Sequence, residues 1–347
     1  MAISQLRCVL LVVAMACACV IQAQPLSSPA NGRVFDDANG NRTFDAAEQG
    51  IAGVAVSNGR DIVRTDRAGN YTLRVQQGQT LFVIKPAGWR VATGSAGLPL
   101  FWRHHAPERG PMLKFGGIPQ TGALPALIDF PLQRAPLPVP AGALNVLVFG
   151  DPQPKSLADV GYYMRDIVEP LLRQDVNRST RGSVPAHAAD LGISLGDIVH
   201  DDLSLYPALN AATAKLGAPW LHVAGNHDLD FDATRDEDSL LTFRNTYGPD
   251  TFAWEDSKAA FIVLDDVVYQ PGQRPAYVGG LRQDQFAFLE AYLPTVPKER
   301  LLVIAVHIPF FNTSSVPELQ SFRDADRDRL FALLKEFPHV LLLSAHS

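Results

Sequence analysis

The strongest constraint on the fold is a series of apolar runs in the second half of the chain. The runs are NVLVFG, LGISLG, PWLHVAG, AAFIVLDD, LLVIAV and VLLLSA. Runs this apolar suit strands that are buried on both faces of a sheet. Helix-like stretches lie between several of them, at LADVGYYMRDIVEPLLRQ, LRQDQFAFLEAYL and ADRDRLFALLKEF. Strands that alternate with helices predict an α/β domain whose helices cover the sheets.

Polar side chains follow five of these runs, at the point where each strand should end. They are Asp151 and Gln153, then Asp197, then Asn226 with His227 and Asp228, then His307, and finally His346. Ligands of α/β sheets bind beyond the carboxyl ends of the strands, so these side chains are expected to meet. A lone histidine or aspartate there is more often a hydrogen-bonded residue or a helix cap. Five such ends in order favour one shared site.

The donor types in this set indicate a two-metal centre. Carboxylate, amide and imidazole donors together suit Mn, Fe, Co or Zn. A carboxylate can bridge two cations ~3.5–4 Å apart, and such a pair can bind phosphate and generate a hydroxide. His227 can point at the substrate instead of at metal, and Asp228 is expected to orient and charge its imidazole.

The order D-x-Q, G-D, G-N-H-D, V-H, A-H from Asn145 to the last residue resembles the calcineurin-like metallophosphoesterase superfamily. The pattern of that family is D-x-H, G-D, G-N-H-[DE], H, G-H-x-H. The resemblance implies an α/β (α+β) four-layered sandwich and a metal-dependent phosphoric ester hydrolase. It implies attack by a metal-bound hydroxide on a phosphate mono- or diester. The implied roles are Asp151 and Gln153 on the first metal, Asp197 as a bridge, Asn226, His307 and His346 on the second metal, and His227 as leaving-group acid or phosphate holder.

The chain departs from that family pattern in three places. Gln153 stands where histidine is commoner, which implies a loosely held or Mn-like first metal. Ala345 replaces the usual glycine. The sequence stops at Ser347, one residue before the second histidine of the last motif, so the domain is expected to be truncated there.

Several further polar residues have simpler expected roles. His200 lies three residues after Asp197, where purple acid phosphatases place a metal-binding tyrosine, and it is expected either near the first metal or as a polar loop residue. Asp201 and Asp202 are expected as helix caps or rim charges. His222 is expected in the core. The pair at 104–105, both histidines, is expected at the surface or an interface.

Residues 30–134 predict a small all-β sandwich domain with antiparallel strands. GRVFDD, IAGVAVSNG, DIVRTDRAGNYTLRV and TLFVIKP are short runs rich in β-branched residues, and NG, AGN and QQG turns separate them. The proline-rich segment 135–143, APLPVPAGA, predicts an extended linker. The phosphoesterase domain is then expected at 144–347.

A loop near the start of this β region has the spacing of an EF-hand calcium loop. Its oxygen donors at positions 1, 3, 5, 7, 9 and 12 are Asp37, Asn39, Asn41, Thr43, Asp45 and Glu48. Position 6 is Arg42 rather than glycine, and strands rather than helices flank the loop. The region resembles B-type calcium modules and the N-terminal domain of some secreted calcineurin-like phosphoesterases. The alternative is an Asn/Asp-rich turn that needs no ion.

The first 23 residues predict a signal peptide, and thus a periplasmic or secreted protein. Arg7 precedes an apolar segment too short for a comfortable span, so no transmembrane segment is expected after its removal. Cys8, Cys17 and Cys19 all lie in this segment, so the mature chain is expected to lack disulfides. A lipoprotein anchor at Cys17 or Cys19 is a minor alternative. The net charge of −6 argues against a standing nucleic-acid partner.

Two other functions stay open at the level of sequence. One is a non-catalytic surface or adhesion protein with a degenerate phosphoesterase domain, which Gln153 and the incomplete last motif favour. The other is a metal-dependent hydrolase that acts on a non-phosphate ester.

Overall fold

The computed structural model describes residues 27–94, 96–135, 143–173, 189–311 and 322–346. The expected signal peptide, most of the linker and the end of the first predicted helix lie outside the described residues. Among those that are described, no helix is long and apolar enough to cross a membrane.

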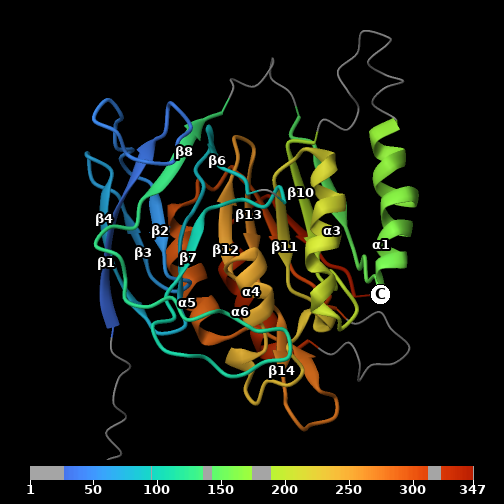
Figure 1. Ribbon diagram of the computed structural model, residues 1–347. Coiled ribbons are helices and arrows are strands. Elements are labelled where there is room, and N and C mark those ends of the chain that lie inside the picture. The colour runs from blue at the N-terminus through green and yellow to red at the C-terminus, as the bar shows by residue number, and fades with distance from the viewer. Residues whose placement is uncertain (1–26, 95, 136–142, 174–188, 312–321, 347) are drawn as a thin grey trace, which may run out of the picture.

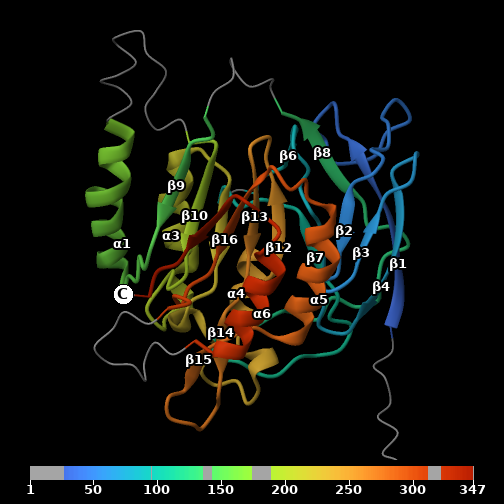
Figure 2. The same ribbon diagram turned by 180° about the vertical axis from the view of Figure 1, so that it is seen from behind.

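The second half of the chain forms two sheets that lie between helices, which confirms the predicted α/β architecture (Figures 1 and 2). One described sheet has the order β11-β10-β9, and the other has the order β12-β13-β16-β17. The strands are β9 Val146–Phe149, β10 Leu191–Leu195, β11 Trp220–Val223, β12 Phe252–Glu255, β13 Ala259–Val263, β16 Leu301–Ala305 and β17 Val340–Leu343. A hairpin of β14 Val267–Tyr269 and β15 Tyr277–Gly279 follows β13.

Three of these strands are buried throughout, as their apolar runs predict. Every residue of β10, β11 and β13 is buried, whereas β9 and β17, at the sheet edges, are partly exposed. The strands β9, β10 and β11 run parallel, as do β13, β16 and β17, while β12 is antiparallel to β13. The carboxyl ends within each parallel set therefore lie at one edge of the sheet.

Helices cover the outer faces of these sheets. The α-helices are α1 Leu157–Tyr163, α3 Tyr206–Thr213, α4 Leu241–Tyr247, α5 Gln283–Tyr292 and α6 Asp324–Leu334. A π-helical turn, Met164–Val168, extends α1, and 3₁₀ turns occupy Leu203–Leu205, Ala214–Leu216, Asn226–Asp228, Asp236–Asp238 and Leu293–Thr295. In both views α1 and α3 lie beside the β9–β11 sheet (Figures 1 and 2). Asp202 caps the turn before α3 by accepting from the backbone N–H of Ser204, as expected.

The N-terminal region forms two described sheets with the orders β4-β1-β8-β6 and β3-β2-β5-β7. Their strands are β1 Ser27–Asp36, β2 Ala55–Ser57, β3 Ile62–Arg64, β4 Asn70–Gln76, β5 Thr80–Val83, β6 Trp89–Val91, β7 Trp102–His104 and β8 Phe130–Arg134. The prediction of purely antiparallel pairing is wrong for β1 and β8, which pair in parallel. A long stretch of chain separates these two strands, and it permits the crossover that parallel pairing needs.

The two regions pack directly against each other and share one hydrophobic core. The ring of Phe101 lies 5.2 Å from that of Phe252 and 5.7 Å from that of Trp254. Lys85 donates from Nζ to the backbone carbonyl of Glu255 at 2.6 Å. The two regions on either side of the predicted linker are thus in direct contact.

His104 is buried in this interface, whereas a surface position was the alternative expectation. Its Nε2 lies 3.0 Å from the carbonyl oxygen of Arg244, and its Nδ1 lies 2.8 Å from the hydroxyl of Thr80. Burial, together with the charge of Arg244, lowers the pKa of His104 to about 3. The imidazole is therefore neutral in the folded protein at neutral pH.

We expect His104 to make folding sensitive to mild acid. The unfolded imidazole, with a pKa near 6.5, binds a proton that the folded one rejects, so its contribution to stability is present above pH 6.5 and is lost as the pH falls toward 3. At pH 5 the loss of folding stability from this residue amounts to about 2 kcal/mol. Urea unfolding of wild type and His104→Gln at pH 7 and pH 5 measures it. The wild type should lose about 2 kcal/mol more than the variant, and equal losses would contradict the assignment.

Candidate metal centre

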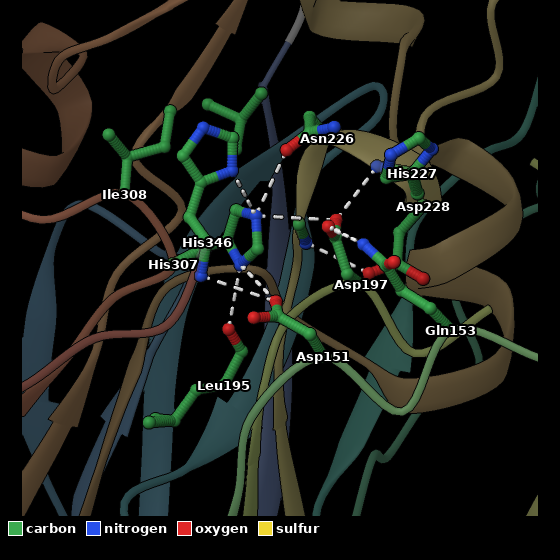
Figure 3. A network of polar contacts seen from close by, with 12 residues as sticks. Asp151, Gln153, Leu195, Asp197, Asn226, His227, Asp228, His307, Ile308 and His346 are labelled. Atoms are coloured by element: carbon green, nitrogen blue, oxygen red, sulfur yellow. Dashed lines mark hydrogen bonds and ion pairs between the residues drawn. The ribbon is translucent and has the colours of Figure 1, made fainter. Parts of the chain in front are cut away.

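The ends of five strands, three parallel strands of one sheet and two of the other, deliver the sequence-predicted residues to one place (Figure 3). Asp151 follows β9, Asp197 follows β10 and Asn226 follows β11, while His307 follows β16 and His346 follows β17. The first three therefore come from one sheet and the two histidines from the other. The site lies where the carboxyl ends of the two sheets meet.

The imidazole of His307 is the centre of a tight group of donor atoms. Its Nε2 lies 3.0 Å from Oδ1 of Asn226, 3.3 Å from Oδ1 of Asp197 and 2.9 Å from Nδ1 of His346. Its Nδ1 lies 2.8 Å from the carbonyl oxygen of Leu195, to which it can donate, so in the neutral imidazole Nε2 keeps its lone pair toward the group. A single proton cannot satisfy this many lone pairs. Ligand atoms around one tetrahedral cation with ~2.0–2.1 Å bonds lie about 3.3 Å apart, so these atoms fit a bound metal.

The electrostatics of the group also favour a cation. Burial lowers the pKa of His307, but the hydrogen bond and charge of Asp197 outweigh burial and raise the pKa to about 9. The two groups are almost fully buried. The negative potential that would hold a proton at this place would hold a divalent cation more strongly.

Asp197 lies between the residues predicted to bind the first metal and those predicted to bind the second. Its Oδ1 accepts from the backbone N–H of His227 at 2.9 Å, and its other oxygen is in contact with the side-chain amide of Gln153. A Cβ on Gly225 would lie 2.1 Å from the backbone nitrogen of Asp197, and one on Gly196 would lie 2.4 Å from Nδ1 of His307. The glycines of the G-D and G-N-H-D motifs are therefore required for the close approach of these loops.

The first-metal half of the predicted set is arranged less completely. Oδ1 of Asp151 accepts from the backbone N–H of His346 at 3.2 Å and lies 3.8 Å from Nδ1 of His307. The amide nitrogen of Gln153 faces Asp197, so a half-turn of the amide would bring its oxygen to that side instead.

Backbone strain is concentrated at this centre. Of six described non-glycine residues with positive φ, five are in or beside it: Asp151, Gln153, Asp197, Asp201 and His346. Such conformations cost about 1–3 kcal/mol each and persist at sites where the surroundings enforce them.

The carboxylate that holds His227 is Asp201, and the expectation that Asp228 holds it is wrong. Nδ1 of His227 lies 2.7 Å from Oδ1 of Asp201. Asp228 is completely buried and accepts from the backbone N–H groups of Ile198 and Gly225. It also accepts from the hydroxyl of Tyr206 at 2.9 Å, and burial with the nearby charge of Asp197 raises its pKa to about 7. Asp228 thus ties the loops together.

Two residues near the centre were not anticipated as site residues. Asp266 follows β13 and accepts from the backbone N–H groups of His307 and Ile308, which fixes the turn that carries the histidine. Its place at the end of the run AAFIVLDD was the available signal. Asp201, the second of these residues, was expected to be a cap or a rim charge.

The other two histidines have different surroundings. His200 stacks on His227. His222 is buried against Tyr247, as expected of a core residue.

Comparisons with known proteins agree with this geometry. Residues 144–347 match the family described as calcineurin-like phosphoesterase, more than half of the chain. The chain belongs to the calcineurin-like phosphoesterase family. Residues 36–116 match the N-terminal domain of calcineurin-like phosphoesterase.

Other comparisons add little to the family assignment. No curated protein matches significantly. Among solved structures, the chain is similar to purple acid phosphatase PPD1 from yellow lupin (Lupinus luteus) seeds, with 12% identity and a TM-score of 0.43. The match covers 85% of this chain and 53% of the lupin chain, so this chain spans about half of the lupin protein. The calcineurin-like phosphoesterase family implies a phosphoester hydrolase with a dinuclear metal centre, and Asp197, His307 and His346 are candidate ligands here.

Proposed function

We propose that this calcineurin-like phosphoesterase is an exported enzyme that hydrolyses a phosphate mono- or diester at a centre for two divalent transition metals. The observation that carries the proposal is the group of donor atoms around Nε2 of His307. Asn226, His307 and His346 would hold one cation, Asp151 and Gln153 the other, and Asp197 would contact both. Mn, Fe, Zn and Co all suit these donors.

A bound pair of cations would supply positive charge to the phosphate oxygens and lower the pKa of the attacking water. His227, held through Nδ1 by Asp201, would carry a proton on Nε2. That proton passes to the oxygen of the departing alcohol when the phosphorus–oxygen bond breaks. The carboxylate of Asp201 stabilises the imidazolium before the transfer and fixes the orientation of its ring.

The test is metal analysis together with turnover of aryl phosphate mono- and diesters by purified protein. We expect up to two transition-metal ions per chain at this centre and hydrolysis that stops when a chelator removes them. Metal binding without turnover of either ester would favour the non-catalytic alternative. Turnover that vanadate does not inhibit would favour a non-phosphate ester as the substrate.

We also propose calcium as the ligand of the loop from Asp37 to Glu48. Asp37 is almost completely buried, and the hydrogen bonds that its carboxylate receives from described residues are long ones, at 3.3 Å from the backbone N–H of Arg42. Oε1 of Glu48 is buried without a partner among the described residues. The side-chain amides of Asn39 and Asn41 both converge on Oδ2 of Asp45, at 2.7 and 2.9 Å.

Calcium is expected to stabilise the chain by about 1–3 kcal/mol at 10 mM, if the dissociation constant is near the 10⁻⁴–10⁻³ M of extracellular modules. Thermal unfolding with and without calcium measures this effect. Glu48→Gln should abolish the shift because it removes a charged ligand. Asp66→Asn, in an exposed turn of the same region, should keep it. A shift that survives Glu48→Gln would exclude this loop as the site.

A further inference from the structure

A second group of metal-binding side chains lies beside the proposed centre. His200, Asp201 and His227 each offer one ligand atom, and these three atoms lie within 4.8 Å of one another. His200 and Asp201 follow β10, and His227 follows β11. The proposed two-metal centre uses none of these three side chains as a ligand.

His200 has a nitrogen that lacks a partner. Its Nδ1 is buried and forms no hydrogen bond with any residue that the structure describes. Leaving a buried polar atom in this condition costs about 1–3 kcal/mol. A cation that accepts the lone pair of Nδ1 would remove this cost.

The side chains need to move little to share one ion. Ligand atoms of a tetrahedral zinc lie about 3.3 Å apart, so the group has to contract by at most about 1.5 Å. The side chain of Asp201 is half exposed and free to adjust, and the ring of His200 already lies with its centroid 4.1 Å from that of His227. Sharing one ion gives up the hydrogen bond between Asp201 and His227.

We propose that zinc binds His200, Asp201 and His227 as a third metal and inhibits the enzyme. Two imidazoles, one carboxylate and an open fourth position are a donor set typical of zinc, whereas magnesium and calcium prefer oxygen donors. Zinc that binds a ring nitrogen of His227 takes the place of a proton there, so the imidazolium that donates to the leaving group cannot form while zinc is bound. The inhibition rests on the proposed function, but the binding of zinc does not.

Zinc binding is tested by equilibrium dialysis with elemental analysis over a range of free zinc concentrations. Wild type should bind one zinc more than His200→Asn and Asp201→Asn. Each of these changes replaces a strong zinc donor with a neutral amide oxygen and should weaken the extra site by more than about 100-fold. His339→Asn, at an exposed histidine outside the site, should bind like wild type. Magnesium should fill no such site.

Equal zinc stoichiometry in wild type and both site variants would overturn the proposal. Because the measured quantity is a difference of one equivalent, it does not depend on how fully the two-metal centre is loaded. It also stays valid if the chain hydrolyses no ester, which would contradict the proposed function alone.

Inhibition is tested separately, with each variant compared with its own rate at low zinc. Wild type and His339→Asn should lose activity over the zinc concentrations that fill the third site. His200→Asn should need at least about 100-fold more zinc for the same fractional loss. A third zinc that binds through His200 and leaves the rate unchanged would refute the inhibitory role.

Discussion

Asp197→Asn is expected to reduce kcat/KM for an aryl phosphate by about 10³-fold. The carboxylate of Asp197 contacts Gln153 on one side and Nε2 of His307 on the other, so it is placed to touch both cations. Asparagine keeps the shape and removes the charge. Metal ions supply several kcal/mol of transition-state stabilisation, and each 1.4 kcal/mol is a factor of ten.

The measurement combines steady-state kinetics with metal content after dialysis, because the loss of activity should accompany a loss of bound metal. Asp328→Asn is the matched control, since Asp328 is exposed and pairs with its neighbour Arg327 on the surface of α6. It should retain both activity and metal. If Asp197→Asn had the same kinetics as wild type, the proposed centre would have no part in the mechanism.

His227→Gln is expected to reduce kcat/KM by about 10²–10⁴-fold for esters with poor leaving groups. Alkyl phosphates need a proton on the leaving oxygen, whereas nitrophenyl phosphates leave readily as anions. The loss should therefore be far smaller for the nitrophenyl ester. A loss of the same size for both esters would indicate that His227 binds phosphate instead of donating a proton.

Replacing each of the two aspartates near His227 should have a different consequence. Asp201→Asn should lower kcat/KM for the alkyl ester by about 10–100-fold, because the ring loses the carboxylate at its Nδ1. Asp228→Asn should instead lower the free energy of unfolding by about 1–3 kcal/mol, since its amide would face the N–H groups of Ile198 and Gly225. The opposite pattern would restore Asp228 as the positioning residue.

The sequence was informative wherever an apolar strand ended in a polar side chain. Such strands are buried by their composition, and parallel neighbours place their ends at one edge, so Asp151, Asp197, Asn226, His307 and His346 could be expected together before any coordinates. The same pattern could have identified Asp266 at the end of its run. The α/β fold followed from the same runs and the helices between them.

Hydrogen-bond partners and the junction of the two regions were decided only by the tertiary structure. Asp228 is adjacent to His227 in sequence, yet the turn at 226–228 directs it into the core, and Asp201 reaches the imidazole from another loop. His104 likewise owes its depressed pKa first to burial in the interface and then to the charge of Arg244, 140 residues away. Strand burial and register arise from local composition and period, which a sequence displays directly. The direction of one side chain, and the partner it finds, depend on loop conformations and packing between distant segments, which the order of residues does not display.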